Sequence, residues 1–395
     1  MSLQLTAPFR KSDGRTVRLG KKKAPEKKQI AKLKVALSLD IGSRYTKMLL
    51  GRQKAGSLFI EQAFTANTPE RAYEDGTVAD AAALETMLKS LAARNRNMTK
   101  DLIFSIESTK IIKREFVIPQ IPEEDILGLV TYEMMQYLPI DISEYTVQPN
   151  IIGGVIEGDT EKTKVSVSAV PKNIIQSYQK LFTAAGFKPV SMDINSNSVE
   201  KLLRFDIMRN PASEYINKNV VFIDMGHSCS NVSVYENGRY QFNRTIEIGG
   251  RGLDAVIADS LEIDPQKAQN VKKELFSQIS VPELDEKYGN MPSGYQSQSI
   301  YERTLIDIMS VIRQWAAQVD KVLQYMTRSR EKKIDKIYIY GGGSLIKGIS
   351  EFFEQKLGIK TASASALNCF EYGQAVDARH IISTHGNALG AFLRL

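Results

Sequence analysis

Cysteine, histidine and long apolar runs are scarce in this chain of 395 residues. Its two cysteines, Cys229 and Cys369, favour a reducing compartment over a disulfide-stabilised fold. The three histidines, His227, His380 and His385, lack the spacing of zinc ligands, so a zinc enzyme is not expected. No run of about 18 uncharged apolar residues occurs and the first residues form no apolar leader. We therefore expect neither a membrane-spanning helix nor a secretory signal.

Positive charge is concentrated at one end of the chain. The formal net charge is +7, but residues 1–34 hold eleven Lys or Arg against two acidic residues, a net of +9, which leaves −2 for the other 361 residues. We expect this tail to be disordered. It is either a tether to acidic lipid or nucleic acid, or a solvated leader. The remainder has no basic stripe, so specific recognition of nucleic acid is not expected.

An apolar strand that ends in Asp-x-Gly occurs twice, about half a chain apart. The first is "SLDIGSRYTKMLL" from residue 38, and the second is "NVVFIDMGHSCSNVSVY" from residue 219. In both, hydroxyl residues and a second strand follow. One such hairpin is more often a simple turn. Two of them favour two lobes that face one phosphate chain.

A third glycine-rich strand end supports the same interpretation. In "IYIYGGGSLIKGI", from residue 337, a strand opens into three glycines and then a helix. The glycines allow an adenine or ribose to lie against the backbone, and the helix directs its first N–H groups at the ligand. Apolar spacing predicts further helices at about 79–94 and 301–328. Residues 101–189 read as a compact α+β unit that begins with the strand "LIFSIES".

In this order and spacing, the three motifs resemble those of the actin-like ATPase superfamily. The resemblance covers residues 35–395 and implies an α/β fold, a ribonuclease-H-like duplicated two-lobe ATPase fold with an inserted α+β subdomain. The implied organisation is a basic tail at 1–34, a first-lobe core at 35–100 completed by 190–217 and 380–395, an insert at 101–189, a second-lobe core at 218–250 and 325–379, and a smaller second-lobe subdomain at 251–324.

Within the superfamily, the insert resembles that of the PilM family of pilus-assembly proteins. "REFVIPQIPEEDILGLVTYEMMQYLPIDISEYTVQ" contains the acidic-x-x-Gln-Tyr-x-Pro pattern of that family at Glu133, Gln136, Tyr137 and Pro139. "EIGGRGLDAVIA", from residue 247, is similar to the Gly-Gly stretch that opens the smaller second-lobe subdomain in the FtsA and PilM families.

The resemblance implies that ATP and Mg²⁺ bind between the lobes. Asp40 and Asp224 would hold the Mg²⁺ through water. The residues expected to contact the nucleotide are Asp40, Gly42, Ser43, Thr46, Lys47, Asp224, Gly226, Ser228, Ser230, Gly249, Gly250, Lys272, Gly341, Gly342, Gly343 and Ser344.

Departures from the superfamily pattern affect hydrolysis more than binding. Many relatives have Gly-Gly-Thr where this chain has His227, Ser228 and Cys229. Relatives that hydrolyse quickly have Glu or Gln in the first connecting helix to orient water, and the candidates here are Asn195 and Asp193. Phosphoryl transfer depends on positioning and charge stabilisation, so we expect at most a slow ATPase.

The resemblance implies a cytoplasmic scaffold of type IV pilus assembly. Its partner would be the cytoplasmic N-terminal segment of an inner-membrane protein similar to PilN, and the partner or the basic tail would hold it at the inner face of the cell membrane. Self-association stays open. One alternative is an FtsA-like division protein that polymerises at the membrane, less expected because no amphipathic helix follows Leu395. The other is a small-molecule kinase, which would need a carboxylate base that the insert does not obviously offer.

Overall fold

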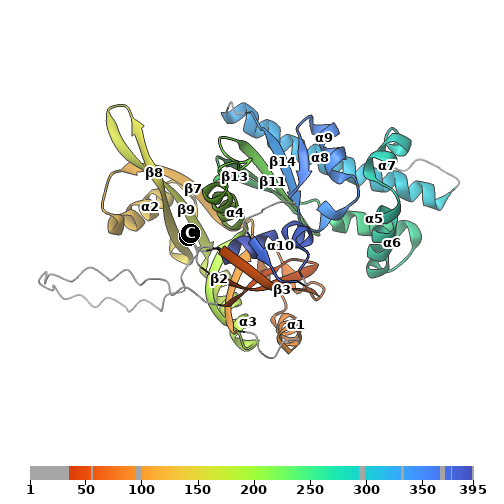
Figure 1. The fold of residues 1–395 in the computed structure, drawn as a ribbon, viewed down its shortest axis with the longest axis horizontal. Helices are drawn as coiled ribbons and strands as arrows, with labels where there is room; N and C mark the ends of the chain where they lie inside the picture. The colour runs from red at the N-terminus through yellow and green to blue at the C-terminus, as the bar shows by residue number, and fades with distance from the viewer. Residues whose placement is uncertain are drawn as a thin grey trace, which may run out of the picture.

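The fold has two lobes and a separate smaller sheet, as a computed structural model shows (Figure 1). The structure describes residues 35–54, 57–93, 99–292, 299–330, 333–364, 370–374 and 376–393. The basic tail predicted at residues 1–34 lies outside these ranges.

The first lobe is built on a six-stranded sheet in the order β10-β6-β1-β2-β3-β16. Its strands are β1 (Ala36–Ile41), β2 (Tyr45–Lys54), β3 (Ser57–Asn67), β6 (Asp101–Ile106), β10 (Lys188–Ile194) and β16 (Phe370–Tyr372). Strands β1, β6 and β10 are parallel, and every residue of β1 is buried. Such a continuous run is typical of a sheet covered on both faces. Helices α1 (Ala81–Ala93) and α3 (Lys172–Ala184) cover one face, and the strands β4 (Tyr73–Glu74) and β5 (Thr77–Val78) form a small hairpin beside them.

The second lobe repeats this design with a five-stranded sheet in the order β13-β12-β11-β14-β15. Its elements are β11 (Asn219–Met225), β12 (Ser230–Glu236), β13 (Arg239–Ile246), α5 (Gly250–Leu261), α6 (Pro265–Gln278), α7 (Val281–Tyr288), α8 (Ile300–Arg330), β14 (Lys336–Tyr340), the 3₁₀ turn η2 (Gly342–Leu345), α9 (Ile349–Leu357) and β15 (Thr361–Ser363). Helix α8 buries Leu305, Ile308, Ile312, Trp315 and Val319. The helical spacing of these residues in the sequence had predicted this helix.

Two helices lie between the lobes, α4 (Asn195–Arg209) and α10 (Ala378–Phe392) (Figure 1). The Lys201 ammonium of α4 donates hydrogen bonds to the carbonyls of Ala391, at 3.2 Å, and Leu393, at 2.8 Å. A Cβ at Gly390 would lie 2.1 Å from the Ser198 carbonyl oxygen, so the helices can approach this closely only at a glycine. The two lobes therefore meet on a packed helix pair.

The separate sheet is smaller than the predicted insert. It consists of β7 (Ile112–Pro119), β9 (Thr160–Pro171) and β8 (Tyr145–Glu157), with α2 (Glu123–Tyr137) and the 3₁₀ turn η1 (Ile142–Glu144). The range predicted at 101–189 also included β6, which pairs in parallel with β1, and α3, which packs into the first-lobe core. Backbone pairing thus limits the separate unit to about residues 112–170, which we call the insert from here on.

Candidate functional site

A cavity of about 640 Å³ lies between the two lobes. Both Asp-x-Gly hairpins, β1–β2 and β11–β12, contribute to its wall, as do the start of α4, helices α5, α6 and α10, and the η2 turn. The structure thus brings together segments that are up to 347 positions apart in the chain. The predicted site residues that line it are Asp40, Gly42, Ser43, Lys47, Asn195, Asp224, Gly226, Ser228, Gly250, Lys272, Gly342 and Gly343.

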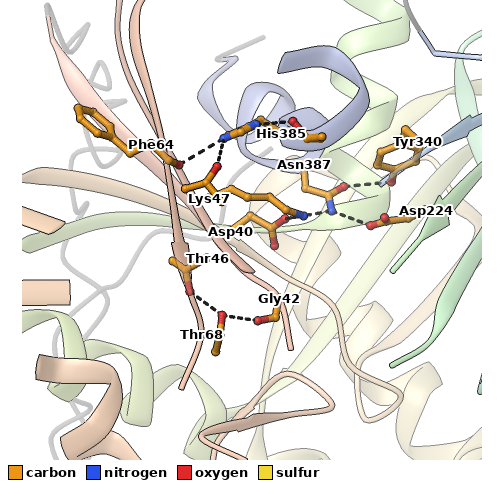
Figure 2. A network of polar contacts seen from close by, with 12 residues as sticks. Asp40, Gly42, Thr46, Lys47, Phe64, Thr68, Asp224, Tyr340, His385 and Asn387 are labelled. Carbon is orange, nitrogen blue, oxygen red and sulfur yellow. Dashed lines mark hydrogen bonds and ion pairs between the residues drawn. The ribbon is translucent and has the colours of Figure 1, made fainter. Parts of the chain in front are cut away.

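The carboxylates of the two hairpins face each other across an amide (Figure 2). The Asn387 side-chain amide of α10 donates to Asp224 Oδ2 at 2.8 Å and to Asp40 Oδ2 at 3.4 Å, while its oxygen accepts from the Tyr340 hydroxyl at 3.0 Å. Lys47 Nζ lies 3.6 Å from Asp40 Oδ2. Burial raises the pKa of Asp224, an effect that the charge of Lys47 and the Asn387 amide oppose.

The paired carboxylates fit a hydrated Mg²⁺. Carboxylate oxygens are hard ligands, and Mg²⁺ in nucleotide sites uses one or two of them together with water and phosphate oxygens. Among the described residues no group of three His, Cys, Asp or Glu could hold a metal ion by itself. Asp40 is only 4% exposed, so its charge needs a partner close by. Lys47 and the Asn387 amide supply one in this structure. Mg²⁺ bound here would depend on the phosphates that accompany it.

The turn of the second hairpin is tight enough to require glycine. A Cβ at Gly226 would lie 2.6 Å from the Cys229 carbonyl oxygen, and one at Gly249 would lie 2.5 Å from that of His227. The Gly250 N–H donates to the Gly226 carbonyl at 3.0 Å, so the start of α5 holds the second hairpin in place. Across the cavity, the Ser43 hydroxyl donates to the Ser228 hydroxyl at 2.9 Å. The two turns therefore touch each other, one from each lobe.

Five predicted contact residues do not line the cavity but support residues that do. Thr46 is buried and hydrogen-bonded to Thr68, whose hydroxyl donates to the Gly42 carbonyl at 2.7 Å (Figure 2). The Ser230 hydroxyl donates to the Ile248 carbonyl and accepts from Trp315 Nε1. Gly249 packs under the second hairpin as described above. At Gly341, φ is +84° and a Cβ would lie 2.4 Å from Asp224 Oδ1. The Ser344 hydroxyl donates to the Gly341 carbonyl.

The structure does not support a water-orienting role for Asp193, one of the two residues predicted to have it. Its carboxylate is 1% exposed, lies 2.6 Å from Lys201 Nζ, and does not line the cavity. The prediction for Asp193 is therefore corrected: it is the partner of the lysine that joins α4 to α10. Asn195 does line the cavity, at the first position of α4.

Lys272 has an acidic partner that sequence reasoning did not find. Its Nζ lies 2.7 Å from Asp254 Oδ1, and His227 Nε2 lies 3.3 Å from the other oxygen of the same carboxylate. Burial raises the pKa of Asp254. The His227 hydrogen bond and the Lys272 charge lower it by more, so the pKa lies below its usual value. Gln269, at the position where relatives have an acid, instead accepts from Arg44 and donates to Tyr45 of the first lobe.

Glu107 is a further residue that sequence reasoning missed. It follows the last residue of β6 and lines the cavity. Burial raises the pKa of Glu107 to about 7, although the charge of Lys113 and a hydrogen bond from the Ser196 N–H oppose the shift. The signal was present in the strand "LIFSIES", but that strand had been assigned to the insert rather than to the first-lobe sheet.

A duplicated sheet in two lobes, with an Asp-x-Gly hairpin from each lobe on one cavity, defines the actin-like ATPase fold. Among solved structures, the chain is similar to the PilM-PilN type IV pilus biogenesis complex, with a TM-score of 0.73 and 18% identity over 91% of this chain and 98% of that one. It is also similar to the ethanolamine utilization protein EutJ from Carboxydothermus hydrogenoformans, with a TM-score of 0.50 and 16% identity over 90% of this chain and 89% of that one.

The family follows from the sequence itself. Residues 38–392 match the model of the family described as type IV pilus assembly protein PilM. The chain belongs to this family, which confirms the resemblance drawn from the motifs. None of the described helices combines the length and the apolar character that a bilayer-spanning segment needs.

Proposed function

We propose that this chain is a scaffold of type IV pilus assembly that binds ATP with Mg²⁺ between its lobes. The observation that carries the proposal is that both Asp-x-Gly hairpins face one cavity of about 640 Å³, a volume that suits a nucleotide. Membership of the PilM family supplies the biological setting. In this setting the chain acts in the cytoplasm, at the inner face of the membrane.

The residues of the cavity suggest how a nucleotide is held. The tight turns at Gly42 and Gly226 let phosphate oxygens approach the backbone, and Lys47 supplies positive charge. Asp40 and Asp224 would hold Mg²⁺ through water, and the ion would neutralise phosphate charge. Lys272, oriented by Asp254, and the η2 glycines would bind the ribose and base.

Contacts across the cavity mouth suggest a clamp. Gln269 of the second lobe donates to the Tyr45 hydroxyl at 3.0 Å, and Lys273 donates to the same oxygen at 3.1 Å. Arg44 donates to the Gln269 side-chain oxygen at 3.0 Å. Nucleotide would shift the balance between closed and open lobes only to the extent that it binds the closed form more tightly.

The insert is well placed to respond to such closure. Lys113, at the start of the insert, donates to the Asn197 side chain in α4, and its Nζ lies 3.3 Å from the ring centroid of Tyr240 in the second lobe. It follows the Glu107–Ile111 loop, which begins in the cavity wall. Movement of either lobe would therefore be transmitted to the insert sheet.

For the partner, we propose the cytoplasmic N-terminal segment of a PilN-like inner-membrane protein, docked near the insert. A similar solved structure is that of a PilM-PilN complex. Exposed large apolar side chains gather on this insert: Val117, Leu127, Tyr132, Met135, Tyr137, Ile151 and Ile156. Apolar side chains of this kind suit an extended or amphipathic peptide. The acidic start of α2, with Glu123, Glu124 and Asp125, suits a basic one.

Equilibrium binding of labelled ATP to the full chain, with and without EDTA, tests the nucleotide proposal. We expect saturable binding that EDTA weakens. A folded sample without saturable binding at millimolar ATP would contradict it. Steady-state phosphate release should show slow hydrolysis, on the order of one turnover per minute or less, because Asn195 stands where relatives orient water with Glu or Gln.

Replacing the insert tests the partner proposal. Ile112 and Ala169 are paired neighbours in the insert sheet, so a short Gly-Ser turn can replace residues 113–168 without breaking the first-lobe sheet. We expect ATP binding to survive and capture of a synthetic PilN-type N-terminal peptide to be lost. Retention of the peptide would place the docking site elsewhere. Removal of residues 1–34 is the companion variant, and loss of binding to anionic vesicles there would assign membrane association to the basic tail.

A further inference from the structure

Three neighbouring parallel strands end at the same edge of the first-lobe sheet, and each carries a polar residue there. In the order β10-β6-β1, Asp40 lies near the end of β1, Glu107 directly after β6 and Asn195 directly after β10. The register pairs Asp40 with Ser105, and Ile106 with Ile194. Glu107 therefore lies on the middle strand, between the metal-binding candidate and the water-orienting candidate. Ligand sites form at this edge of parallel sheets.

The backbone around Glu107 is held by the β4–β5 turn, whose residues Asp75 and Gly76 also line the cavity. The Asp75 carboxylate accepts from the Thr109 N–H at 2.8 Å and from the Thr109 hydroxyl at 2.6 Å. Gly76, with φ of +71°, packs so tightly that a Cβ would lie 2.5 Å from the Glu107 carbonyl oxygen. A glycine with positive φ and the exposed Asp75 carboxylate thus fix the loop. Rigid support of this kind is what a positioned reactive side chain needs.

The carboxylate of Glu107 is also held from the cavity side. The Ser196 N–H, at the start of α4 and next to Asn195, acts on this carboxylate and lowers its pKa. Asn195 Oδ1 is buried without a hydrogen-bond partner. An unpaired buried acceptor is costly, and a water molecule in the cavity could satisfy it. Glu107 and Asn195 both line the cavity, so this water would share the cavity with the Glu107 carboxylate.

We propose that Glu107 orients the attacking water and accepts its proton when this chain hydrolyses ATP. The inference rests on the proposed function, because it needs ATP in the cavity. A lone pair of the water oxygen forms the new bond to the γ-phosphorus. The bond from that phosphorus to the bridging oxygen breaks, and its electron pair leaves with ADP. One proton of the water passes to Glu107, which then releases it to solvent, so that ATP and water give ADP, phosphate and a proton.

The surroundings of Glu107 favour this role over that of Asn195. An amide cannot accept a proton from water at neutral pH, whereas a carboxylate can. A general base is most effective when its pKa is close to the working pH. Burial, as described above, raises the pKa of Glu107 to about 7. Asn195 then acts as an acceptor that helps to place the water, and Glu107 takes the proton.

The test compares Glu107→Gln with the wild-type full chain in two assays, equilibrium binding of a labelled non-hydrolysable ATP analogue and single-turnover hydrolysis of labelled ATP. We expect binding within about 3-fold of wild type and hydrolysis reduced about 100-fold. Glu107→Asp, which keeps a shorter carboxylate, should recover part of the rate. Glu115→Gln is the matched control, since Glu115 pairs with Lys164 at 2.9 Å on the insert and does not line the cavity. It should leave both values unchanged.

Each other outcome contradicts the inference in a recognisable way. Hydrolysis in Glu107→Gln at the wild-type rate shows that another group takes the proton. Loss of analogue binding in Glu107→Gln assigns the residue to binding. Wild-type protein that binds the analogue but releases no phosphate overturns the role of Glu107 and leaves the nucleotide clamp intact. Wild-type protein that fails to bind overturns both. If Glu107→Gln does not fold, the hydrolysis rates of Glu107→Asp and Asn195→Ala decide. If both variants hydrolyse ATP at the wild-type rate, the inference is contradicted.

Discussion

The two hairpins that face the cavity share a backbone design but hold their carboxylates differently. In the first lobe, Asp40 lies 3.6 Å from the Lys47 ammonium. In the second lobe, Asp224 takes its hydrogen bond from the neutral Asn387 amide, at 2.8 Å, and burial raises its pKa. The first carboxylate thus has a cation of its own hairpin, whereas the second depends on a residue 163 positions away. The duplication repeats the turn, but not the environment of the acid.

The supports behind the turns differ in the same sense. The first turn is held by Thr68, whose hydroxyl donates to the Gly42 carbonyl at 2.7 Å. The second turn is held by the start of α5, through Gly249 and Gly250. A side-chain hydroxyl supports the first turn, whereas closely packed backbone, with no room for a Cβ at Gly249, supports the second. Substitutions should therefore affect the second hairpin more strongly.

Removal of either carboxylate should have the largest effect. We expect Asp40→Ala and Asp224→Ala each to weaken ATP binding in the presence of Mg²⁺ about 100-fold, or about 2.7 kcal/mol, because each deletes a partner of the ion. Titration calorimetry with and without Mg²⁺ measures this. Asp125→Ala, on the exposed start of α2, is the control. Equal affinity in Asp40→Ala and wild type would limit the metal site to the second lobe.

Alanine substitutions at the two hairpin glycines, Gly42 and Gly226, should lower the free energy of unfolding by different amounts. A Cβ at Gly226 would lie 2.6 Å from a backbone oxygen, whereas one at Gly42 would lie 3.0 Å from its nearest neighbour. We expect Gly226→Ala to lower the free energy of unfolding by about 2 kcal/mol, since overpacking typically costs 1–3 kcal/mol, and Gly42→Ala to cost less than about 1 kcal/mol. Urea denaturation measures both. Gly342→Ala, where no atom lies within 4 Å of the added Cβ, should change stability little.

The Asn387 amide should stabilise the fold more than the comparable amide of Asn243. Asn387→Ala leaves buried Asp224 without its amide donor, so we expect a loss of about 1–2 kcal/mol in the free energy of unfolding at pH 7. Asn243 is the control, because it also accepts from a tyrosine hydroxyl, that of Tyr240 at 2.9 Å, but does not line the cavity. Equal losses in Asn387→Ala and Asn243→Ala would mean that the bond to Asp224 adds nothing.

The smallest effect concerns pH and the third carboxylate of the cavity. The pKa of Glu107 rises on folding from 4.5 to about 7. Its contribution to stability is therefore full below about pH 4.5 and is lost as pH rises through about 7. Glu107→Gln lacks this loss. We expect its free energy of unfolding, relative to wild type, to be higher at pH 7.5 than at pH 5, by an amount on the order of 1 kcal/mol. The Lys113 pKa, lowered to about 8, leaves that residue charged over most of this range. A parallel pH dependence in both proteins would contradict the shift.

Local pattern in the sequence was enough for the elements and for most of the site. The period of apolar residues predicted α8, and the Asp-x-Gly pattern predicted both hairpins and most of the cavity residues they supply. These features depend on neighbours within a few positions, where spacing and glycine geometry act directly. The same local evidence could not place "LIFSIES", since a buried strand reads alike in any sheet.

That one misplaced strand explains most of what was missed. With β6 assigned to the insert, Glu107 had no reason to lie beside Asp40. Asp254 and Asn387 were missed for a related reason, because their partners are Lys272 and Asp224, far along the chain. Side-chain pairing at such separations has no counterpart in local spacing.

The sequence by itself determined that this chain forms a duplicated two-lobe fold of the PilM family, with glycines in the turns of its hairpins. Hydrophobic period and turn chemistry are local properties of the residues. Only the tertiary structure decided which carboxylates share the cavity. Parallel strand pairing placed Glu107 between Asp40 and Asn195, and Lys201, which pairs with Asp193, is buried where α4 packs against α10. Both outcomes follow from contacts between distant segments, where burial removes water and each charge must find a partner nearby.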